Sequence, residues 1–156
     1  MTIRPIESRD IESILAIQAG CPEIAQWSAW DYERVARGEM AGWISERDQS
    51  VAGFLVARRV AADLEILNFA VRIGARLRGA GSALLKEALR WGELFQAENA
   101  FLEVRSSNLN ALRFYQSRSF VVTGTRPRYY SLPTEDALLL TATLAGPAVK
   151  PTLGVR

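Results

Sequence analysis

The chain has 156 residues, 49% of them apolar and 23% charged, with a formal net charge of +2. These values are typical of one globular domain with a sizeable core, and the charge is too small to predict nucleic-acid binding. The absence of histidine and the single cysteine exclude a histidine-based catalytic triad, a Cys/His zinc site and an internal disulfide, and they favour a reducing cytoplasm.

The first ten residues carry several charges and no apolar core, so we expect no signal peptide. No run of about 18 apolar residues occurs, so we expect no membrane-spanning helix. The expected location is therefore the cytoplasm.

Strand and helix patterns alternate along the chain. The predicted strands are residues 2–6, 42–47, 51–59, 64–71, 101–105, 120–125 and 136–144. The predicted helices are residues 8–19, 29–37, 82–96 and 109–118. Polar residues stand where three of these helices begin, and they are the expected N-caps: Ser8 or Asp10, Ser28, and Asn108.

No repeat or linker divides residues 1–144, which we interpret as a single domain. Residues 145–156 contain prolines and glycines without periodicity, so we expect a loosely ordered tail. The pattern predicts an α/β (α+β) fold with a mixed, mostly antiparallel sheet flanked by helices.

The segment from Arg76 to Ser82 joins the strand ending at Val71 to the long helix. Gly79 and Gly81 remove side chains where that helix begins, which leaves first-turn N–H groups accessible at the positive end of the helix dipole. Nearby arginines add positive charge. The segment therefore predicts an anion site, without saying which anion.

The Arg76-x-x-Gly79-x-Gly81 spacing, with the apolar strand before it and the Leu-Glu-Val-Arg strand after it, resembles the GNAT superfamily of N-acetyltransferases. The order and sequence of these segments are most similar to those of RimI-type enzymes, which acetylate the N-terminal alanine of a small-subunit ribosomal protein. The resemblance implies acetyl-CoA as cofactor and a sheet splayed at the cofactor site. The residues that it implies for cofactor binding are Phe69, Ala70, Val71, Arg76, Leu77, Arg78, Gly79, Ala80, Gly81, Ser82 and Asn108.

Acetyl transfer to an amine needs a base for the amine proton and an acid for the leaving thiolate. From its strand alone, Glu103 is a solvated or arginine-paired glutamate; the resemblance makes it the base. Glu65 on the neighbouring strand is the alternative base, but we favour its interpretation as an exposed strand residue. Tyr115 is by itself a packed helical aromatic, and the resemblance makes it the general acid. Asn108 can cap its helix and contact the cofactor at once.

On the same resemblance, Trp27, Tyr129 and Tyr130 would bind the acceptor; core or edge packing is the alternative. Two positions depart from the family pattern. Arg72 replaces an expected aspartate, which puts the acceptor in doubt more than the cofactor. Ser119 stands where a glycine is usual, which costs free energy if the backbone there is left-handed.

Three functional hypotheses follow. The leading one is N-terminal acetylation of a ribosomal protein. The second keeps the fold and changes the acceptor to another protein terminus or a small amine. The third is a module that binds acyl-CoA without catalysis. A P-loop nucleotide site is disfavoured because its Gly-x-x-x-x-Gly-Lys-Ser/Thr pattern does not occur.

Overall fold

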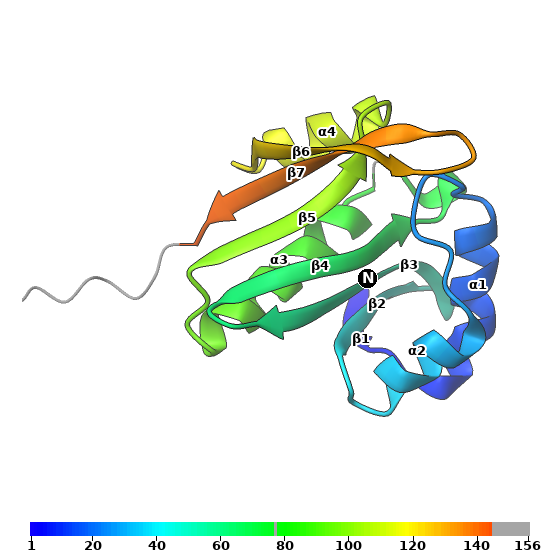
Figure 1. The fold of residues 1–156 in the computed structure, drawn as a ribbon. Helices are drawn as coiled ribbons and strands as arrows, with labels where there is room; N and C mark the ends of the chain where they lie inside the picture. The colour runs from blue at the N-terminus through cyan, green and yellow to red at the C-terminus, as the bar shows by residue number, and fades with distance from the viewer. Residues whose placement is uncertain (77, 145–156) are drawn as a thin grey trace, which may run out of the picture. The chain divides into compact units, whose positions relative to one another are not determined.

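The computed structural model describes residues 1–76 and 78–144 (Figure 1). Leu77 of the glycine loop and the predicted tail at 145–156 lie outside the described residues. The elements in chain order are β1 (Thr2–Pro5), η1 (Ser8–Asp10), α1 (Ile11–Ala19), α2 (Ala29–Ala36), β2 (Ala41–Arg47), β3 (Ser50–Val60), β4 (Asp63–Val71), η2 (Ile73–Ala75), α3 (Ala80–Leu94), β5 (Asn99–Arg105), α4 (Leu109–Gln116), β6 (Val121–Tyr130) and β7 (Glu135–Thr143).

The hydrogen-bonded strand order is β1-β2-β3-β4-β5-β7-β6. The β4–β5 pair is parallel, and the pairs β1–β2, β2–β3, β5–β7 and β6–β7 are antiparallel. This mixed, mostly antiparallel sheet with helices confirms the predicted fold class. The described chain divides into two compact units, one with residues 1–58 and 66–88 and the other with residues 59–65 and 89–144. Because the boundaries fall inside β3, β4 and α3, each of these elements contributes residues to both units.

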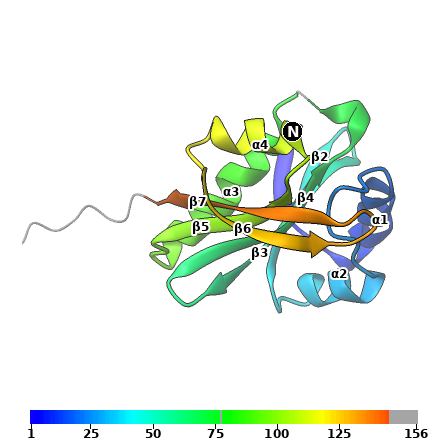
Figure 2. The same ribbon diagram turned by 45° about the horizontal axis from the view of Figure 1, so that its top comes forward.

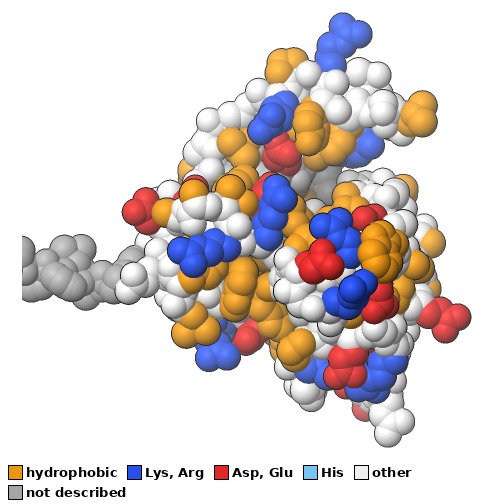
Figure 3. All heavy atoms as spheres, turned by 60° about the horizontal axis from the view of Figure 1, so that its bottom comes forward, with side chains coloured by type: hydrophobic (Ala, Val, Ile, Leu, Met, Phe, Trp, Pro, Cys, Tyr) orange, Lys and Arg blue, Asp and Glu red, His pale blue; other side chains and the backbone are white. Residues whose placement is uncertain are grey.

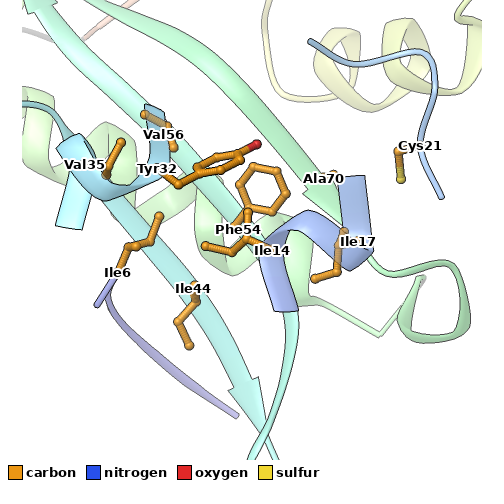
Figure 4. Packing of buried hydrophobic residues seen from close by; sticks show 10 residues of the cluster. All are labelled: Ile6, Ile14, Ile17, Cys21, Tyr32, Val35, Ile44, Phe54, Val56 and Ala70. Atoms are coloured by element: carbon orange, nitrogen blue, oxygen red, sulfur yellow. The ribbon is translucent and has the colours of Figure 1, made fainter. Parts of the chain in front are cut away.

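The first unit is built on an apolar core between α1, α2 and the strands β2, β3 and β4 (Figure 4). Its fully buried large side chains include Ile14, Tyr32, Ile44 and Phe54. The Tyr32 and Phe54 rings meet edge to face, with centroids 5.5 Å apart. Apolar burial of this kind is the main favourable term in folding. The core thereby fixes where α1 and α2 lie against their strands.

Asp10 closes the first turn. Its carboxylate accepts the Glu7 N–H at 2.8 Å and two hydrogen bonds from Arg4, at 2.8 and 2.9 Å. Ser8 instead donates its hydroxyl to Glu33. Asp10 stands at the N-cap position of α1, but its side chain makes no cap hydrogen bond to that helix, so the predicted side-chain cap is wrong for both residues. Burial raises the pKa of Asp10, but the hydrogen bonds from Arg4 and Glu7 outweigh it and hold the net pKa below its ordinary value.

Two local predictions fare differently at α2 and in the β2–β3 hairpin. The Ser28 hydroxyl accepts the Asp31 N–H, which confirms the predicted N-cap of α2. The predicted three-residue hairpin loop is wrong, because Ser50 already belongs to β3. Asp48 and Gln49 alone make the turn, with φ of 51° and 64°. Two positive φ values match the twist of a tight hairpin, although non-glycine residues adopt them at some cost.

The long helix also departs from its predicted bounds. It begins at Ala80 and ends at Leu94, two residues earlier than predicted at each end. Gly81 therefore lies inside the first helical turn, where burial of neighbouring Ala80 and Leu84 outweighs the poor helix propensity of glycine. The helical period predicts one apolar face for this helix. On that face Leu84, Leu85, Ala88 and Gly92 are buried and Leu89 and Phe95 are half-buried, whereas Lys86, Arg90 and Glu93 are exposed.

In the second unit β5 pairs with β7, and β7 pairs with β6, which ends the strand order (Figure 2). β6 is longer than predicted and runs on through Pro127 to Tyr130. A strand with one neighbour tolerates the missing N–H of proline. After α4, Ser119 keeps a left-handed backbone, with φ of 71°. The chain therefore carries the conformational cost that a glycine would avoid.

None of the described helices is both long and apolar enough to cross a membrane. Charged side chains of both signs are interspersed on the face shown in Figure 3. This mixture agrees with the small net charge of the sequence.

Candidate active site

The segment after β4 leaves its strand through a closely packed turn. The Arg72 N–H donates to the Ala52 carbonyl at 2.7 Å, and η2 follows at once. Ala75 is buried in a small cluster with Ala52 and Ala80, against Val71. Because alanine side chains are short, this turn lies close to β3. The packing fixes the point at which the glycine loop begins.

Gly79 sets the start of α3. Its φ is +89°, a left-handed conformation that glycine adopts without strain, and a Cβ there would meet no atom within 4 Å. Its carbonyl accepts the Ala83 N–H at 3.0 Å, which makes Gly79 the N-cap. The first helical residues are then Ala80, Gly81 and Ser82. The N–H groups of Ala80 and Gly81 come before the first i→i−4 acceptor of the helix, so the geometry suits an anion such as phosphate.

The Arg76 guanidinium contacts groups of its own unit. Nε donates to the Val71 carbonyl at 3.2 Å, and Nη2 donates to Cys21 Sγ at 3.3 Å. The Glu23 carboxylate lies 3.6 Å from the same Nη2. Burial raises the pKa of the Cys21 thiol, and Arg76 partly opposes that rise. Arg76, which is predicted to bind phosphate, thus also links the glycine loop to the segment after α1.

Other arginines surround the same loop. Arg72 and Arg78 are exposed, and Arg47 Nη2 donates to the Arg78 carbonyl at 3.3 Å. Their fixed positive charges favour an anionic ligand at the start of α3. The loop therefore combines backbone donors with side-chain charge.

Phe69, Ala70 and Val71, predicted to line the cofactor arm, are the last three residues of β4. Ala70 is buried in the core, and Phe69 and Val71 are half-buried on the opposite face, as strand alternation requires. The Val71 carbonyl already accepts from Arg76. A carbonyl oxygen has two lone pairs, so it can accept one more hydrogen bond.

Trp27 lies between α1 and α2, where it is half-buried. Its ring is tilted against Tyr32, with centroids 5.4 Å apart, and it packs on the edge of the core. The structure thus shows Trp27 packed at the edge of the core, which was the alternative to a role in acceptor binding. The exposed part of the ring remains accessible to a ligand.

Glu103 lies on β5, opposite Leu139 of β7. Its side chain is 19% exposed and ion-pairs through Oε2 with Nε of Arg126, a side chain that is 61% exposed. Oε2 is buried, and its contact with Arg126 is an ion pair without hydrogen-bond alignment. The arginine-paired alternative therefore describes the structure, and the arginine is the more exposed member of the pair. Displacing Arg126 would open one buried carboxylate oxygen.

Glu65, the alternative base, is half-buried at the start of β4. It lies in register with Phe101, two residues before Glu103 on β5. The register therefore places both carboxylates in the same short stretch of the second unit.

Tyr115 is 6% exposed and packs edge to face with Phe114 and Phe120. Burial raises the pKa of its phenol above the ordinary value, so the hydroxyl remains a proton donor at neutral pH. At the start of the same helix the Asn108 side chain accepts the Ala111 N–H at 3.2 Å, which confirms the predicted cap. The amide nitrogen of Asn108 does not take part in that bond.

Tyr130 ends β6 and is half-buried, whereas Tyr129 is 53% exposed. The two rings meet edge to face, with centroids 5.1 Å apart. The Arg105 guanidinium lies 4.5 Å from the Tyr130 ring centroid. Burial, and after it the negative charge of Glu103, raises the pKa of Tyr130 to about 12. The structure therefore couples Tyr130 electrostatically to the predicted base.

The sequence did not reveal two partners of these groups. Arg126 pairs with Glu103, and Glu135 forms a 3.1 Å ion pair with Arg105. Glu135 also accepts the Ser107 N–H at 2.6 Å. Both contacts depend on the register of β7 between β5 and β6, which no local sequence pattern predicts. A prediction of the strand order could have indicated these two contacts.

Comparison with known proteins identifies the family. The sequence model of the acetyltransferase (GNAT) family matches residues 10–120. The chain therefore belongs to the GNAT family, and it is an acetyltransferase whose acetyl donor is acetyl-CoA. The Gly79 conformation, the first-turn N–H groups of α3 and the surrounding arginines fit the pyrophosphate of that donor.

Individual relatives agree with this assignment. An N-alpha-acetyltransferase of Sulfurisphaera tokodaii is 28% identical, over 91% of this chain and 92% of that protein. The ribosomal protein bS18-alanine N-acetyltransferase of Escherichia coli (strain K12) is 26% identical, over 89% of this chain and 95% of that protein. The crystal structure of Ard1 from Thermoplasma volcanium superposes with a TM-score of 0.79 at 31% identity, covering 92% of this chain and 97% of that one.

Proposed function

We propose that the chain transfers the acetyl group of acetyl-CoA to the N-terminal α-amine of a protein that begins with alanine, a small-subunit ribosomal protein. The observation that carries the proposal is the carboxylate of Glu103, which has one buried oxygen and, among the described residues, an ion pair with the largely exposed Arg126. The similarity to the bS18-alanine N-acetyltransferase supports the choice of acceptor. Such an acceptor implies that the enzyme works in the cytoplasm.

The chemistry of the acceptor favours an α-amine. An N-terminal amine has an ordinary pKa of about 7.7 to 8.0, against about 10.4 for a lysine side chain. A useful fraction of α-amine is therefore neutral at pH 7, and one carboxylate acting through water suffices to take its proton. The chain has no histidine to assist a lysine.

Bound acetyl-CoA supplies the thioester. In the proposed reaction Glu103 takes the proton of the attacking amine through water as the C–N bond forms. The C–S bond breaks, and the Tyr115 hydroxyl gives a proton to the leaving sulfur. Backbone N–H groups at the start of α3 hold the pyrophosphate. Trp27, Tyr129 and Tyr130 bind the acceptor, and Asn108 contacts the cofactor with the amide nitrogen that its cap leaves available.

A second candidate is a broader N-terminal acetyltransferase, which the similarity to the Sulfurisphaera tokodaii enzyme favours. It keeps the same residues and relaxes the requirement for alanine. Peptides that start with serine, methionine or alanine would separate the two candidates, because only the first candidate requires alanine.

The test compares two peptides that begin with alanine and contain lysine, one with a free and one with a blocked α-amine. Mass spectrometry locates the added acetyl group. We expect transfer to the free α-amine alone. Equal rates on the blocked peptide would refute the proposal and indicate a lysine or small-amine acceptor, and acetyl-CoA binding without any transfer would indicate a binding module.

A further inference from the structure

Three polar side chains lie together inside the apolar core of the first unit. Gln18 and Asn68 are 6% and 4% exposed, and Tyr32 is fully buried. The Tyr32 hydroxyl donates to Gln18 Oε1. Asn68 Nδ2 donates to the Tyr32 hydroxyl at 2.9 Å. The ring of Tyr32 packs on Phe54, and its hydroxyl points away from Val35 (Figure 4).

The network ends on the main chain of the segment between α1 and α2. Gln18 Nε2 donates to the Trp27 carbonyl at 2.8 Å, and the Trp27 N–H donates to Gln18 Oε1 at 3.0 Å. Asn68 Nδ2 also donates to the Ala25 carbonyl at 3.0 Å. Gln18 thus bonds both main-chain polar groups of Trp27, and Asn68 bonds the main chain two residues earlier, at Ala25.

Every hydrogen bond in the network has one consistent direction. Burial raises the pKa of the Tyr32 phenol, so the hydroxyl keeps its proton and donates it to Gln18. That leaves the Tyr32 oxygen to accept from Asn68. Buried polar groups cost free energy unless they are paired. A core with apolar side chains at these three positions would avoid this cost, but it would not bond the main chain of the segment between α1 and α2. The cost indicates that the network serves the segment it contacts.

We propose that Gln18, Tyr32 and Asn68 are positioning residues for the acceptor, because together they hold the main chain of Trp27 in the orientation that binds the acceptor peptide. The inference rests on the proposed function of Trp27. None of the three side chains needs to touch the substrate. Their effect on the reaction is through the affinity for the acceptor, since acetyl-CoA binds at the glycine loop.

Two variants test this inference. Tyr32→Phe removes the hydroxyl and keeps the ring on Phe54. Gln18→Met keeps the length of the side chain and removes both hydrogen bonds to Trp27. We expect the KM for the alanine peptide to rise about three- to tenfold, the loss that one or two buried hydrogen bonds produce. The KM for acetyl-CoA and kcat should stay within about twofold.

Ser45→Ala is the matched control, because it also removes a buried hydroxyl from the first unit. Ser45 Oγ has no hydrogen-bond partner among the described residues, and the residue lies on β2 opposite Gly53. This variant should leave both KM values unchanged. Hydrogen exchange gives a second measurement: the Trp27 amide should exchange faster in Gln18→Met than in the wild type or in Ser45→Ala.

An unchanged peptide KM in both variants would overturn the inference, and so would an equal rise in both KM values, which would indicate a general loss of structure. A wild-type enzyme that transfers nothing to the alanine peptide would count against the proposed function only. Exchange of the Trp27 amide would then still decide whether the network holds the segment, and an unchanged exchange rate in Gln18→Met would refute it.

Discussion

The glycine loop and the acid–base side chains are built in different ways. At the loop, the proposed ligand groups are backbone N–H groups, and their direction follows from Gly79 and the start of α3. At Glu103 and Tyr115 the proposed reactive groups are side-chain ends, and their state depends on neighbours from other strands and helices. A backbone site is set by a few adjacent residues, whereas a side-chain site is set by the whole second unit.

Because of this difference, the loop and the acid–base residues should be sensitive to different substitutions. We expect the loop to tolerate changes in most side chains but no new charge among its N–H groups. We expect the proposed acid–base residues to tolerate changes in their exposed partners but not the loss of the carboxylate or the hydroxyl. Four variants test that contrast.

Glu103→Gln should produce the largest effect. The amide keeps the size of the side chain and cannot take a proton, so turnover should fall about 100- to 10,000-fold with CoA binding intact. Steady-state kinetics and calorimetry measure the two quantities. Glu65→Gln is the matched control and should keep turnover within a few fold. A reversed result would make Glu65 the base.

Tyr115→Phe should lower turnover by about 100-fold or more, because only the proton-donating hydroxyl is lost. The ring still packs on Phe114 and Phe120, so thermal unfolding should change little. Since burial raises the pKa of the phenol, the wild-type kcat should not fall through this group below about pH 10. A variant with wild-type turnover, measured where chemistry limits the rate, would exclude Tyr115 as the acid.

Gly81→Asp should weaken CoA binding about tenfold or more, because a carboxylate in the first helical turn repels the pyrophosphate. The same charge is favourable for the helix, so the fold should remain intact. Gly81→Asn supplies the size without the charge and should bind CoA more tightly than the aspartate variant. Unchanged affinity in calorimetry would refute the loop assignment.

Arg126→Gln should have the smallest effect, within about fivefold in turnover. Its guanidinium is largely exposed, and ion pairs of this kind contribute about 0 to 1 kcal/mol. The double variant with Glu103→Gln should be no worse than Glu103→Gln alone. A loss as large as that of Glu103→Gln would mean that the pair, and not the carboxylate, carries the chemistry.

Local patterns predicted the features that depend on short stretches of chain. The Ser28 and Asn108 caps each involve residues within four positions of one another, and the buried face of α3 repeats with the same short spacing. α3 begins two residues before its predicted start, because burial of Ala80 outweighs the low helix propensity of glycine. Only the helix propensity can be read from a single sequence.

Contacts between distant residues escaped prediction. The Gln18–Tyr32–Asn68 network joins positions up to 50 residues apart, and Arg126 meets Glu103 only because β7 lies between their strands. Neither has a spacing that a single sequence displays. The roles of Glu103 and Tyr115 were assigned by resemblance, and they remain predictions that the variants above decide.

The last strand of the order has a practical consequence for handling the protein. In β6, Pro127 lacks an N–H and stands between Arg126 and Arg128, so this half of the strand resists addition of a foreign strand. The other half exposes Val121 and Val122, which are 58% and 44% accessible. Concentrated solutions should therefore associate first through residues 121–125. Because residues 121–125 carry no charge, ionic strength should affect this association little.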